Sequence, residues 1–314
     1  MILFHRSIKL LKQRIKRLPS QRFNFIFLGD SWVGNDNRIA IFAAILRDTL
    51  KFNPLFILHG GDTVFAGGNE SEYQQFLNLI SNQDPHYPIP GIEKIPMFVV
   101  PGNHETNGIG GNLSNFHKYI GPEYWSLNGL LPSRYLTLIG LNNINRRYLT
   151  KKEKRKRNLN PDLLYWEYIL DSENLTFLRN NLKGNPATTF IAMHVPPYYG
   201  SFKKFGPPQE QDIITGTKDT GTFISGWRKM KQIITMCGKC LKAKNLLFSH
   251  VHSFDFFKKE SGCLEGLTFT LTGGAGARRE EPVVPFHYVV ITVDNINKKI
   301  DYKPIFLEDI EDPT

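Results

Sequence analysis

The sequence has few cysteines and no long uncharged apolar run, and these two shortages exclude whole classes of protein. Three cysteines among 314 residues are too few, and too odd in number, for a disulfide framework, which predicts a reducing compartment and a cytoplasmic location. No stretch approaches the roughly 18 uncharged apolar residues that a membrane-spanning helix needs. Hydrophobic content of 41% with 12% aromatic residues predicts a folded protein with a sizeable core.

Cysteine spacing gives little support for a thiolate metal site. Cys237 and Cys240 have the Cys-x-x-Cys spacing of a zinc or redox site, but no second pair completes a tetrahedral set. The preferred alternative is two small buried side chains on a helix, because free cysteine is among the most buried residue types.

Acidic residues are absent from the first 20 positions, which carry six Lys or Arg. A second basic segment, 151–157, holds six more with a single acid, and the two segments together account for the whole net charge of +10. A nucleic-acid face usually spreads its positive charge over the fold. Nucleic acid is therefore a less favoured partner for this chain.

The first 20 residues are predicted to form a basic amphipathic helix ahead of one α/β domain at 21–314. Apolar residues recur at helical spacing on one face, and basic residues fill the others. No unbroken apolar core marks a secretory signal. Two alternatives are open for this helix: peripheral contact with an anionic membrane, or packing of its apolar stripe on its own domain.

The second basic segment lies in 144–161, which is predicted to be a basic surface insertion. The run Lys-Lys-Glu-Lys-Arg-Lys-Arg is too charged to be buried. A solvated loop is the preferred interpretation, and contact with a polyanion is the alternative.

Five short apolar runs, at 23–28, 55–58, 97–100, 188–192 and 245–248, each end in an Asp, Asn or His. Helical spacing at 39–50 joins the first two runs into a strand–helix–strand unit, which requires a parallel pair. Ligands bind beyond the carboxyl ends of such strands. We therefore expect one rim to carry Asp30, Asp62, Asn103, His194, His250 and His252.

This donor set contains oxygen and imidazole ligands without thiolate, which suits ions such as Mn, Fe, Zn or Ni. Six donors are too many for one tetrahedral ion with an open position. They are about right for two ions that share a carboxylate, an arrangement suited to in-line displacement at phosphorus. His250 and His252 would share one face if they lie on a regular strand.

Five motifs in order give the chain a specific resemblance. They are Gly29-Asp30-Ser31-Trp32, Gly61-Asp62, Gly102-Asn103-His104-Glu105, Met193-His194 and Ser249-His250-Val251-His252. With them the chain resembles the calcineurin-like metallophosphoesterases, the superfamily that includes purple acid phosphatases, over about residues 22–306. The resemblance implies an α/β fold in which a sandwich of two mixed β-sheets is flanked by α-helices in four layers, αββα.

The resemblance also implies a mechanism, in which a hydroxide that bridges two divalent or trivalent metal ions attacks a phosphate ester. Asp62 would bridge the ions, with Asn103, His194 and His250 at one site. Asp30 and His252 would complete the other site. His104 would contact the phosphate together with Asn103 and protonate the leaving group, so the catalytic residues implied are His104 and Asp62. Glu105 receives no role.

Two positions depart from the family pattern. Trp32 stands where the Asp-x-His motif supplies a ligand, and an indole N–H can only donate. Phe65 stands where purple acid phosphatases have a tyrosine ligand. The metal site of Asp30 and His252 is therefore expected to hold its ion more weakly, with water, Asn35 or Asp36 filling the gap.

A glycine-rich segment, 272–276, resembles one that follows the last histidine motif in many members of the family. A flexible turn is the preferred interpretation, and the alternative is that its N–H groups and Arg278 bind the phosphate.

Three functions follow from these observations. The first is a metal-dependent phosphatase or phosphodiesterase, with the ester class open. The second is a phosphodiesterase or pyrophosphohydrolase that the basic segments direct to a membrane or nucleic acid. The third, suggested by Trp32, is a degenerate, non-catalytic phosphate-binding protein. Oligomeric state is not predicted.

Overall fold

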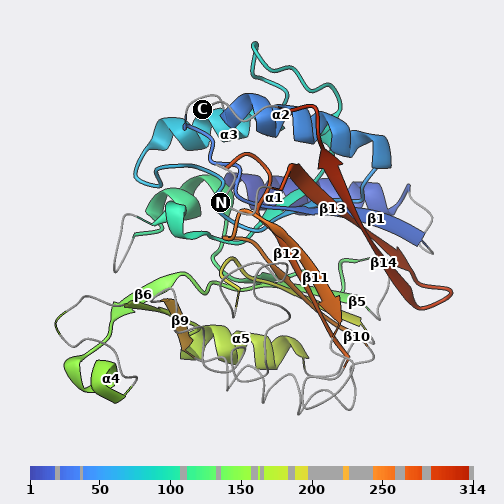
Figure 1. Ribbon diagram of the computed structural model, residues 1–314. Coiled ribbons are helices and arrows are strands. Elements are labelled where there is room, and N and C mark those ends of the chain that lie inside the picture. Colours follow the sequence, from blue (N-terminus) through green and yellow to red (C-terminus); the bar gives the residue numbers. More distant parts are fainter. Residues whose placement is uncertain are drawn as a thin grey trace.

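The computed structural model describes residues 1–17, 22–35, 38–106, 112–131, 136–156, 162, 166–182, 188–196, 222–225, 243–258, 266–277 and 284–310. Two large sheets lie face to face between layers of helices (Figure 1). This arrangement confirms the predicted α/β sandwich of two mixed sheets flanked by helices. Cys237, Cys240 and Cys263 lie outside the described residues.

The first sheet has five strands in the order β14-β13-β1-β2-β3. They are β1 Arg22–Leu28, β2 Ile57–His59, β3 Met97–Val99, β13 Phe286–Asp294 and β14 Lys299–Leu307. β1, β2 and β3 are parallel neighbours, whereas β13 is antiparallel to both β1 and β14. The carboxyl ends of β1, β2 and β3 therefore meet at one edge.

The second sheet has six strands in the order β11-β12-β10-β8-β5-β4. They are β4 Trp125–Ser126, β5 Leu136–Gly140, β8 Thr188–Ala192, β10 Ala243–Phe248, β11 Phe254–Lys258 and β12 Leu267–Thr272. The four inner strands are parallel, and the outer strands β4 and β11 are antiparallel to them. A small third sheet joins β6 Asn145–Tyr148, β7 Trp166–Ile169 and β9 Thr222–Ser225.

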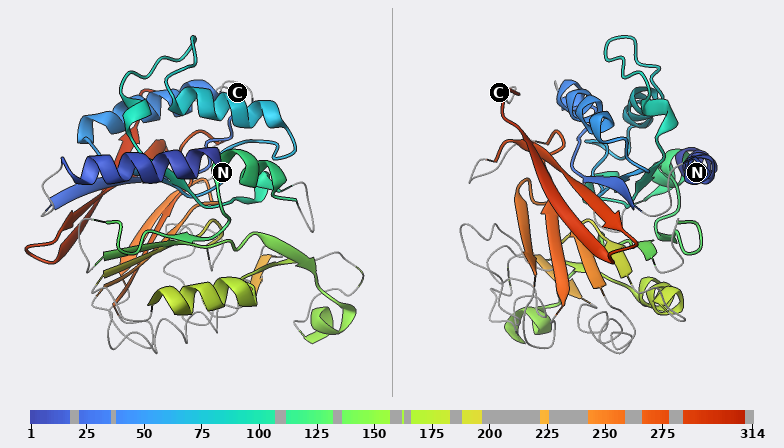
Figure 2. Two further views of the ribbon diagram at one scale, coloured as in Figure 1. Left: turned by 180° about the vertical axis from the view of Figure 1, so that it is seen from behind. Right: turned by 90° about the vertical axis from the view of Figure 1, so that its right-hand side faces the viewer.

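Helices cover both outer faces of the sandwich. α2 (Arg38–Thr49) and α3 (Glu70–Ile80) lie on the side of the first sheet, and α5 (Ser172–Leu182) lies on the side of the second (Figure 1). α1 (Ile2–Ile15) runs beside β3, as the rear view in Figure 2 shows. The shorter helical elements are α4 Lys151–Lys156 and the segments Leu50–Phe52, Ile92–Lys94, Asn103–Glu105 and Phe116–Ile120.

Alternation along β1 divides the core into two clusters. Phe25 and Phe27 face the second sheet, where Phe25 meets Phe190 edge to face with ring centroids 5.2 Å apart. Ile26 and Leu28 point the other way and share a cluster with the buried residues of α2 and α3. Because successive side chains on a strand alternate in direction, a strand that is apolar throughout must be covered on both faces.

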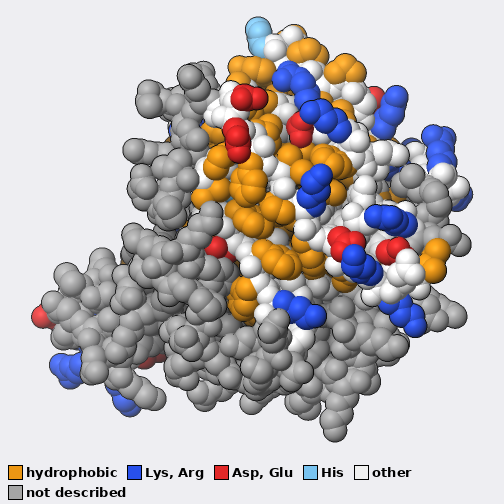
Figure 3. All heavy atoms as spheres, turned by 45° about the vertical axis from the view of Figure 1, so that its right-hand side comes forward, with side chains coloured by type: hydrophobic (Ala, Val, Ile, Leu, Met, Phe, Trp, Pro, Cys, Tyr) orange, Lys and Arg blue, Asp and Glu red, His pale blue; other side chains and the backbone are white. Residues whose placement is uncertain are grey.

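The two sheets close on each other where β11 meets β14. Phe256 lies 5.0 Å from Tyr302, and Phe254 lies 5.7 Å from Phe306, between ring centroids. Hydrophobic side chains gather in the middle of the face shown in Figure 3, with lysines and arginines around them. Phe256 and Phe306 remain 43% and 39% exposed.

The apolar stripe of the amino-terminal helix α1 is docked on the protein. Leu3 and Leu11 are buried, and Phe4 packs edge to face on Phe98 with ring centroids 5.8 Å apart. The Ser7 hydroxyl donates to the carbonyl oxygen of Met97 (2.7 Å) and accepts from its N–H (3.0 Å). α1 therefore covers the outer edge of β3, whose backbone groups would otherwise be unpaired.

The basic segment after β6 is ordered more than its composition predicts. Thr150 and Glu153 form a capping box at the start of α4, in which each side chain accepts from the other residue's backbone N–H. Glu153 also accepts from both terminal nitrogens of Arg147, at 2.7 and 3.1 Å. α4 thus stands where a loop was expected, and Lys154 is buried, but the three other bases of α4 whose side chains are described are exposed. A basic surface insertion at 144–161 stays a prediction. Residues 157–161 lie outside the described part.

Within the described residues, no helix combines the length and the apolar character needed to cross a membrane.

Ser7→Ala is expected to lower the free energy of unfolding by about 2 kcal/mol, because it leaves a buried N–H and a buried carbonyl without partners. Denaturant unfolding of the full chain measures the change. Lys12→Ala, on the exposed face of the same helix, is the matched control and is expected to have little effect. Equal stability of the two variants would contradict the proposed closure of the β3 edge.

Candidate metal centre

Asp30 and Asp62 follow the carboxyl ends of the adjacent parallel strands β1 and β2. Both residues have left-handed backbone, with φ of 62° and 54°. Gly61, with φ of 100°, precedes Asp62, and a Cβ at Gly61 would lie 2.7 Å from Nδ1 of His194. The turn therefore requires glycine here, both for its φ and for the close approach of the imidazole.

Asp62, Asn103, His194 and His250 converge on one point. Nε2 of His194 lies 2.9 Å from Oδ1 of Asn103, 3.4 Å from Oδ1 of Asp62 and 3.2 Å from Nδ1 of His250. One ligand atom each from Asp62, His194 and His250 fit within 4.8 Å of one another. Nδ1 of His194 is bonded to the carbonyl oxygen of Gly60 (2.8 Å), which turns Nε2 toward this cluster.

The electrostatics of this cluster favour a bound cation. Burial lowers the pKa of His194, but the carboxylate of Asp62 outweighs burial and raises it to about 9. Burial raises the pKa of Asp62, but His194 and the backbone N–H of His104 bring it below its ordinary value. Burial and the neighbouring His194 lower the pKa of His250. A positive charge is thus stabilised beside Asp62, and His250 presents a neutral imidazole.

Asp30 and His252 form a second group at the same rim. Oδ2 of Asp30 accepts from the backbone N–H of His250 (3.0 Å), and Oδ1 lies 3.7 Å from Nε2 of His252. Oδ1 is buried and has no hydrogen-bond partner among the described residues. Burial raises the pKa of Asp30 well above its ordinary value. A buried carboxylate oxygen without a partner is costly, and a cation would satisfy it.

The two histidines of the last motif do not lie on a strand. β10 ends at Phe248, and His250 has left-handed backbone with φ of 71°. The expectation of one shared face is therefore wrong, since the turn directs His250 toward His194 and His252 toward Asp30.

Trp32 lies between the two groups of metal-binding candidates, next to Asp62 and His252. Its indole N–H donates to Oδ2 of Asp62 at 3.4 Å, and its ring lies 4.8 Å from the rings of both His104 and His252. Phe65 packs edge to face on Trp32 with centroids 5.4 Å apart. Neither aromatic side chain supplies a ligand, so the donors of the second group are Asp30, His252 and the shared Asp62.

His104 lies on the open side of the cluster. Its backbone N–H donates to Oδ1 of Asp62 (2.8 Å), and Nδ1 of its ring is bonded to the carbonyl oxygen of Phe65 (2.6 Å). The side chain is 24% exposed, and Nε2 lies 3.9 Å from Oδ2 of Asp62. The imidazole is thus fixed beside Asp62 and reachable from solvent.

Glu105 has a structural role that the sequence reasoning missed. Its buried carboxylate accepts from the backbone N–H groups of Asp62 (2.9 Å), Thr63 (2.6 Å) and Gly102 (2.6 Å), and from the Thr63 hydroxyl (2.6 Å). One side chain thereby ties the loop after β2 to the loop after β3. The motif Gly-Asn-His-Glu contains the residue, but its partners Asp62 and Thr63 are 43 and 42 residues away in sequence.

Arg146 and Tyr168, which no motif indicated, stand near the rim. The Tyr168 ring lies edge-on to His250 with centroids 5.7 Å apart, and the guanidinium of Arg146 lies 5.6 Å from the Tyr168 ring centroid. Arg146 also contacts the Thr106 hydroxyl at 3.5 Å. A cation therefore stands close to the loop that carries Asn103.

The glycine-rich segment anchors the Asp30 loop. The N–H groups of Ala275 and Ala277 donate to the carbonyl oxygens of Gly29 (3.0 Å) and Asp30 (2.7 Å), and that of Gly273 donates to Ser253 (3.3 Å). The alternative in which these three amides bind an anion is therefore contradicted, because each already has a backbone acceptor. Arg278 lies outside the described residues.

Parallel strands that end in Asp, Asn and His donors around a buried carboxylate define a metallophosphoesterase type of centre. The family model for calcineurin-like phosphoesterases matches residues 23–226. The chain belongs to this family, which supports a metal-dependent phosphoester hydrolase in general terms and confirms the resemblance drawn from the motifs.

Solved structures with the same fold include two with a TM-score of 0.53. One is the purple acid phosphatase PPD1 from yellow lupin (Lupinus luteus) seeds, 15% identical, with 92% of this chain and 55% of that chain covered. The other is GAP50, the anchor in the inner membrane complex of Plasmodium, 10% identical, with 93% and 87% covered. The chain thus spans about half the length of the lupin enzyme. A search of curated protein sequences found no match.

Glu105→Gln is expected to lower the free energy of unfolding by about 2 kcal/mol or more, because hydrogen bonds from several amides to one ionised acceptor are lost or weakened. The same variant should bind Mn²⁺ more weakly, since the Asp62 backbone loses its support. Denaturant unfolding and metal titration measure both effects. Glu308→Gln, at an exposed acid, is the control, and indistinguishable results for the two variants would refute the role given to Glu105.

His59 is buried beside the centre and must be neutral, because Nδ1 accepts the Gly61 N–H (3.2 Å) while Nε2 bonds the Ser31 hydroxyl (3.0 Å). Burial lowers its pKa to about 3. As the pH drops below about 6.5, the His59 imidazole takes up a proton in the unfolded chain but not in the folded one. The free energy of unfolding therefore decreases as the pH is lowered from about 6.5 to 3.

His59→Asn should therefore reduce the loss of unfolding free energy between pH 6.5 and 4 by about 2 kcal/mol. Denaturant unfolding across this range, with chelator present, checks the slope. The exposed His86→Asn should leave it unchanged, and a slope for His59→Asn equal to that of the parent chain would count against a neutral His59.

Proposed function

We propose that the protein is a metal-dependent hydrolase of phosphate esters, with Asp62, Asn103, His194 and His250 at one metal site and Asp30 and His252 at the other. The convergence of the first four donors around Nε2 of His194 supports this proposal most. The residues fit metal ions, because they offer oxygen and neutral imidazole donors and a buried carboxylate oxygen that lacks a partner.

Bound divalent ions would lower the pKa of water and neutralise charge on the phosphoryl oxygens. The protein's own residues would orient the phosphate and protonate the leaving group. His104 stands at the open side with its ring fixed by the Phe65 carbonyl, which suits contact with the phosphate and protonation of a departing alkoxide. The Asn103 amide would help to orient the phosphate. Arg146, close to the loop that carries Asn103, is a further candidate for contact with an anionic substrate.

A specific observation favours a second function, a non-catalytic phosphate-binding protein. The Trp32 indole donates to Oδ2 of Asp62, the residue that both metal sites would share. GAP50, which shares the fold, is described as an anchor. Against this alternative, all six predicted donor residues are present, and only the additional histidine of the first motif is replaced, by Trp32.

Three broader expectations remain proposals. We propose a single catalytic domain at 21–314 behind the helix of residues 1–20, a cytoplasmic location, and a phosphoester substrate. A narrower form of the same proposal is a phosphodiesterase or pyrophosphohydrolase that acts on lipid-linked substrates. In this form the basic helix directs the enzyme to a membrane.

Asp62→Asn should abolish hydrolysis and lower metal content, because the shared carboxylate is required by both sites. Metal analysis of the purified protein is expected to find up to two ions per chain. A panel of chromogenic phosphate monoesters and diesters, assayed with Mn²⁺, Fe²⁺, Zn²⁺ and Ni²⁺, measures turnover and decides the ester class. Glu308→Gln serves as the unaffected control. If the parent protein neither binds metal nor hydrolyses any ester, the hydrolase proposal is wrong and the non-catalytic phosphate-binding function is favoured.

Trp32→His restores the missing imidazole and removes the competing N–H, so it should raise the occupancy of the second site. The expected result is Mn²⁺ binding about tenfold tighter at the weaker site, which corresponds to about 1.4 kcal/mol. Trp32→Phe, which removes the N–H without adding a ligand, is the matched control. If both variants bind the second ion equally well, the indole does not limit this site.

A further inference from the structure

Much of the positive charge of the docked amino-terminal helix is exposed to solvent. α1 contains four Lys or Arg and no acid, and Lys16 and Arg17 follow directly after it. The apolar stripe faces β3, whereas Lys9, Lys12 and Lys16 are exposed on the outer face. Neither packing of the helix nor the chemistry of the metal centre accounts for these cations.

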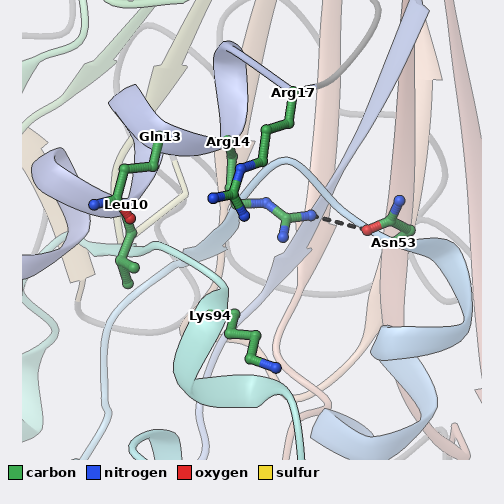
Figure 4. A pocket seen from close by; sticks show the side chains of 6 residues that line it. All are labelled: Leu10, Gln13, Arg14, Arg17, Asn53 and Lys94. Carbon is green, nitrogen blue, oxygen red and sulfur yellow. Dashed lines mark hydrogen bonds between the residues drawn. The ribbon is translucent and has the colours of Figure 1, made fainter.

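One side of the same helix borders a cavity of about 290 Å³. Its lining residues are Leu10, Gln13, Arg14, Arg17, Asn53 and Lys94. Leu10, Gln13 and Arg14 recur at i, i+3 and i+4 and therefore share one face of α1, and Arg17 follows just after the end of the helix. Figure 4 shows Arg14 directed at Asn53, with Arg17 beside it and Lys94 on the opposite wall. The volume is close to the lower end of the range for small-molecule sites, about 300 Å³.

Arg14 is held in place before any ligand binds. Its guanidinium donates to Oδ1 of Asn53 (2.9 Å) and to the carbonyl oxygen of Pro54 (2.7 Å). Its Nε is buried and has no hydrogen-bond partner in the described part of the chain. A fixed guanidinium loses little conformational entropy on binding, and its positive charge attracts a phosphate.

The charge of this pocket is not neutralised by nearby acids. Among the described residues no carboxylate pairs with Arg14 or Arg17, and like charges at i and i+3 repel each other. Glu93 lies 3.8 Å from the Lys94 ammonium, but this pair is largely exposed and therefore weak. The partial negative charge at the end of α1 is about half an elementary charge, smaller than that of the two arginines.

The pocket is also separate from the metal centre. Asn53 precedes β2 and Lys94 precedes β3, so both stand at the amino ends of these strands. The donors of the metal centre follow the carboxyl ends, at the opposite end of the sheet. A ligand in this pocket is therefore not a substrate in position for hydrolysis.

We propose that this pocket binds the phosphorylated headgroup of an anionic phospholipid, with α1 lying along the membrane surface. Arg14 and Arg17 bind the phosphate, and Lys94 closes the opposite side. The exposed Lys9, Lys12 and Lys16 continue the basic surface along the helix, which favours a lipid surface over a free solute. The pocket selects a phosphate monoester on the headgroup, and the lysines add attraction to any anionic membrane.

Flotation of the full chain with vesicles tests this site, in the presence of chelator so that hydrolysis does not contribute. Two sets of phosphatidylcholine vesicles are compared, one with a phosphoinositide monophosphate and one with phosphatidylserine at equal surface charge. The parent chain is expected to bind the phosphoinositide vesicles about tenfold more tightly, as two charged contacts at a membrane surface allow.

The double variant Arg14→Gln/Arg17→Gln should lose this preference, so that both kinds of vesicle bind equally. Lys9→Gln/Lys12→Gln removes the same charge outside the pocket and should weaken both kinds of binding while keeping the preference. Arg17→Glu alone should also remove the preference. Arg17 is exposed, and its side chain makes no hydrogen bond or ion pair with the described residues. Thermal unfolding identifies any loss of folding in the double variant.

Two results would overturn the proposal. The first is that the pocket variants and the lysine variant prefer phosphoinositide vesicles over phosphatidylserine vesicles to the same extent. General electrostatic attraction between the helix and the membrane would then explain the binding. The second is calorimetric binding of soluble inositol phosphate or inorganic phosphate without any preference among vesicles, which would make the ligand a solute. Because the readout is binding without metal, failure here leaves the hydrolase proposal intact.

Discussion

The buried carboxylate of Glu105 holds the rim of the first sheet together. It accepts hydrogen bonds from backbone N–H groups on two separate loops, those that carry Asp62 and Asn103. Backbone N–H groups that turn inward at a strand end need an acceptor, and no strand partner remains to supply one. The negative charge that satisfies them is also placed near Asp62, and burial raises the pKa of Glu105 above its ordinary value. A cation at the rim would offset the repulsion between these carboxylates.

Much of the fold could be predicted from local pattern. Runs such as 23–28 and 188–192 became buried parallel strands, because continuous apolar segments must be covered on both faces. Turn geometry was beyond that reasoning. The left-handed backbone of His250 separates it from His252 and depends on contacts with Asp30, which is 220 residues away in sequence.

The hydrogen-bond partners of polar residues were the second feature that the sequence could not predict. Thr150 and Glu153 show the spacing of a capping box, but the surrounding charge run concealed it. Glu105 was given no role because its acceptor function exists only after β2 and β3 are paired. Trp32 was identified as a departure, whereas its hydrogen bond to Asp62 required coordinates. Residue types at strand ends can therefore be predicted, and the bonds among them cannot.

Four residues at the rim, Asp30, Trp32, Asp62 and His250, adopt left-handed backbone that non-glycine side chains rarely take. Each costs on the order of 1 kcal/mol or more. A directed-evolution campaign that selects only for heat resistance would therefore tend to replace these residues with glycine or asparagine, and would discard the donors together with the strain. The centre thus marks the part of this chain where stability and chemistry make opposite demands on the same backbone.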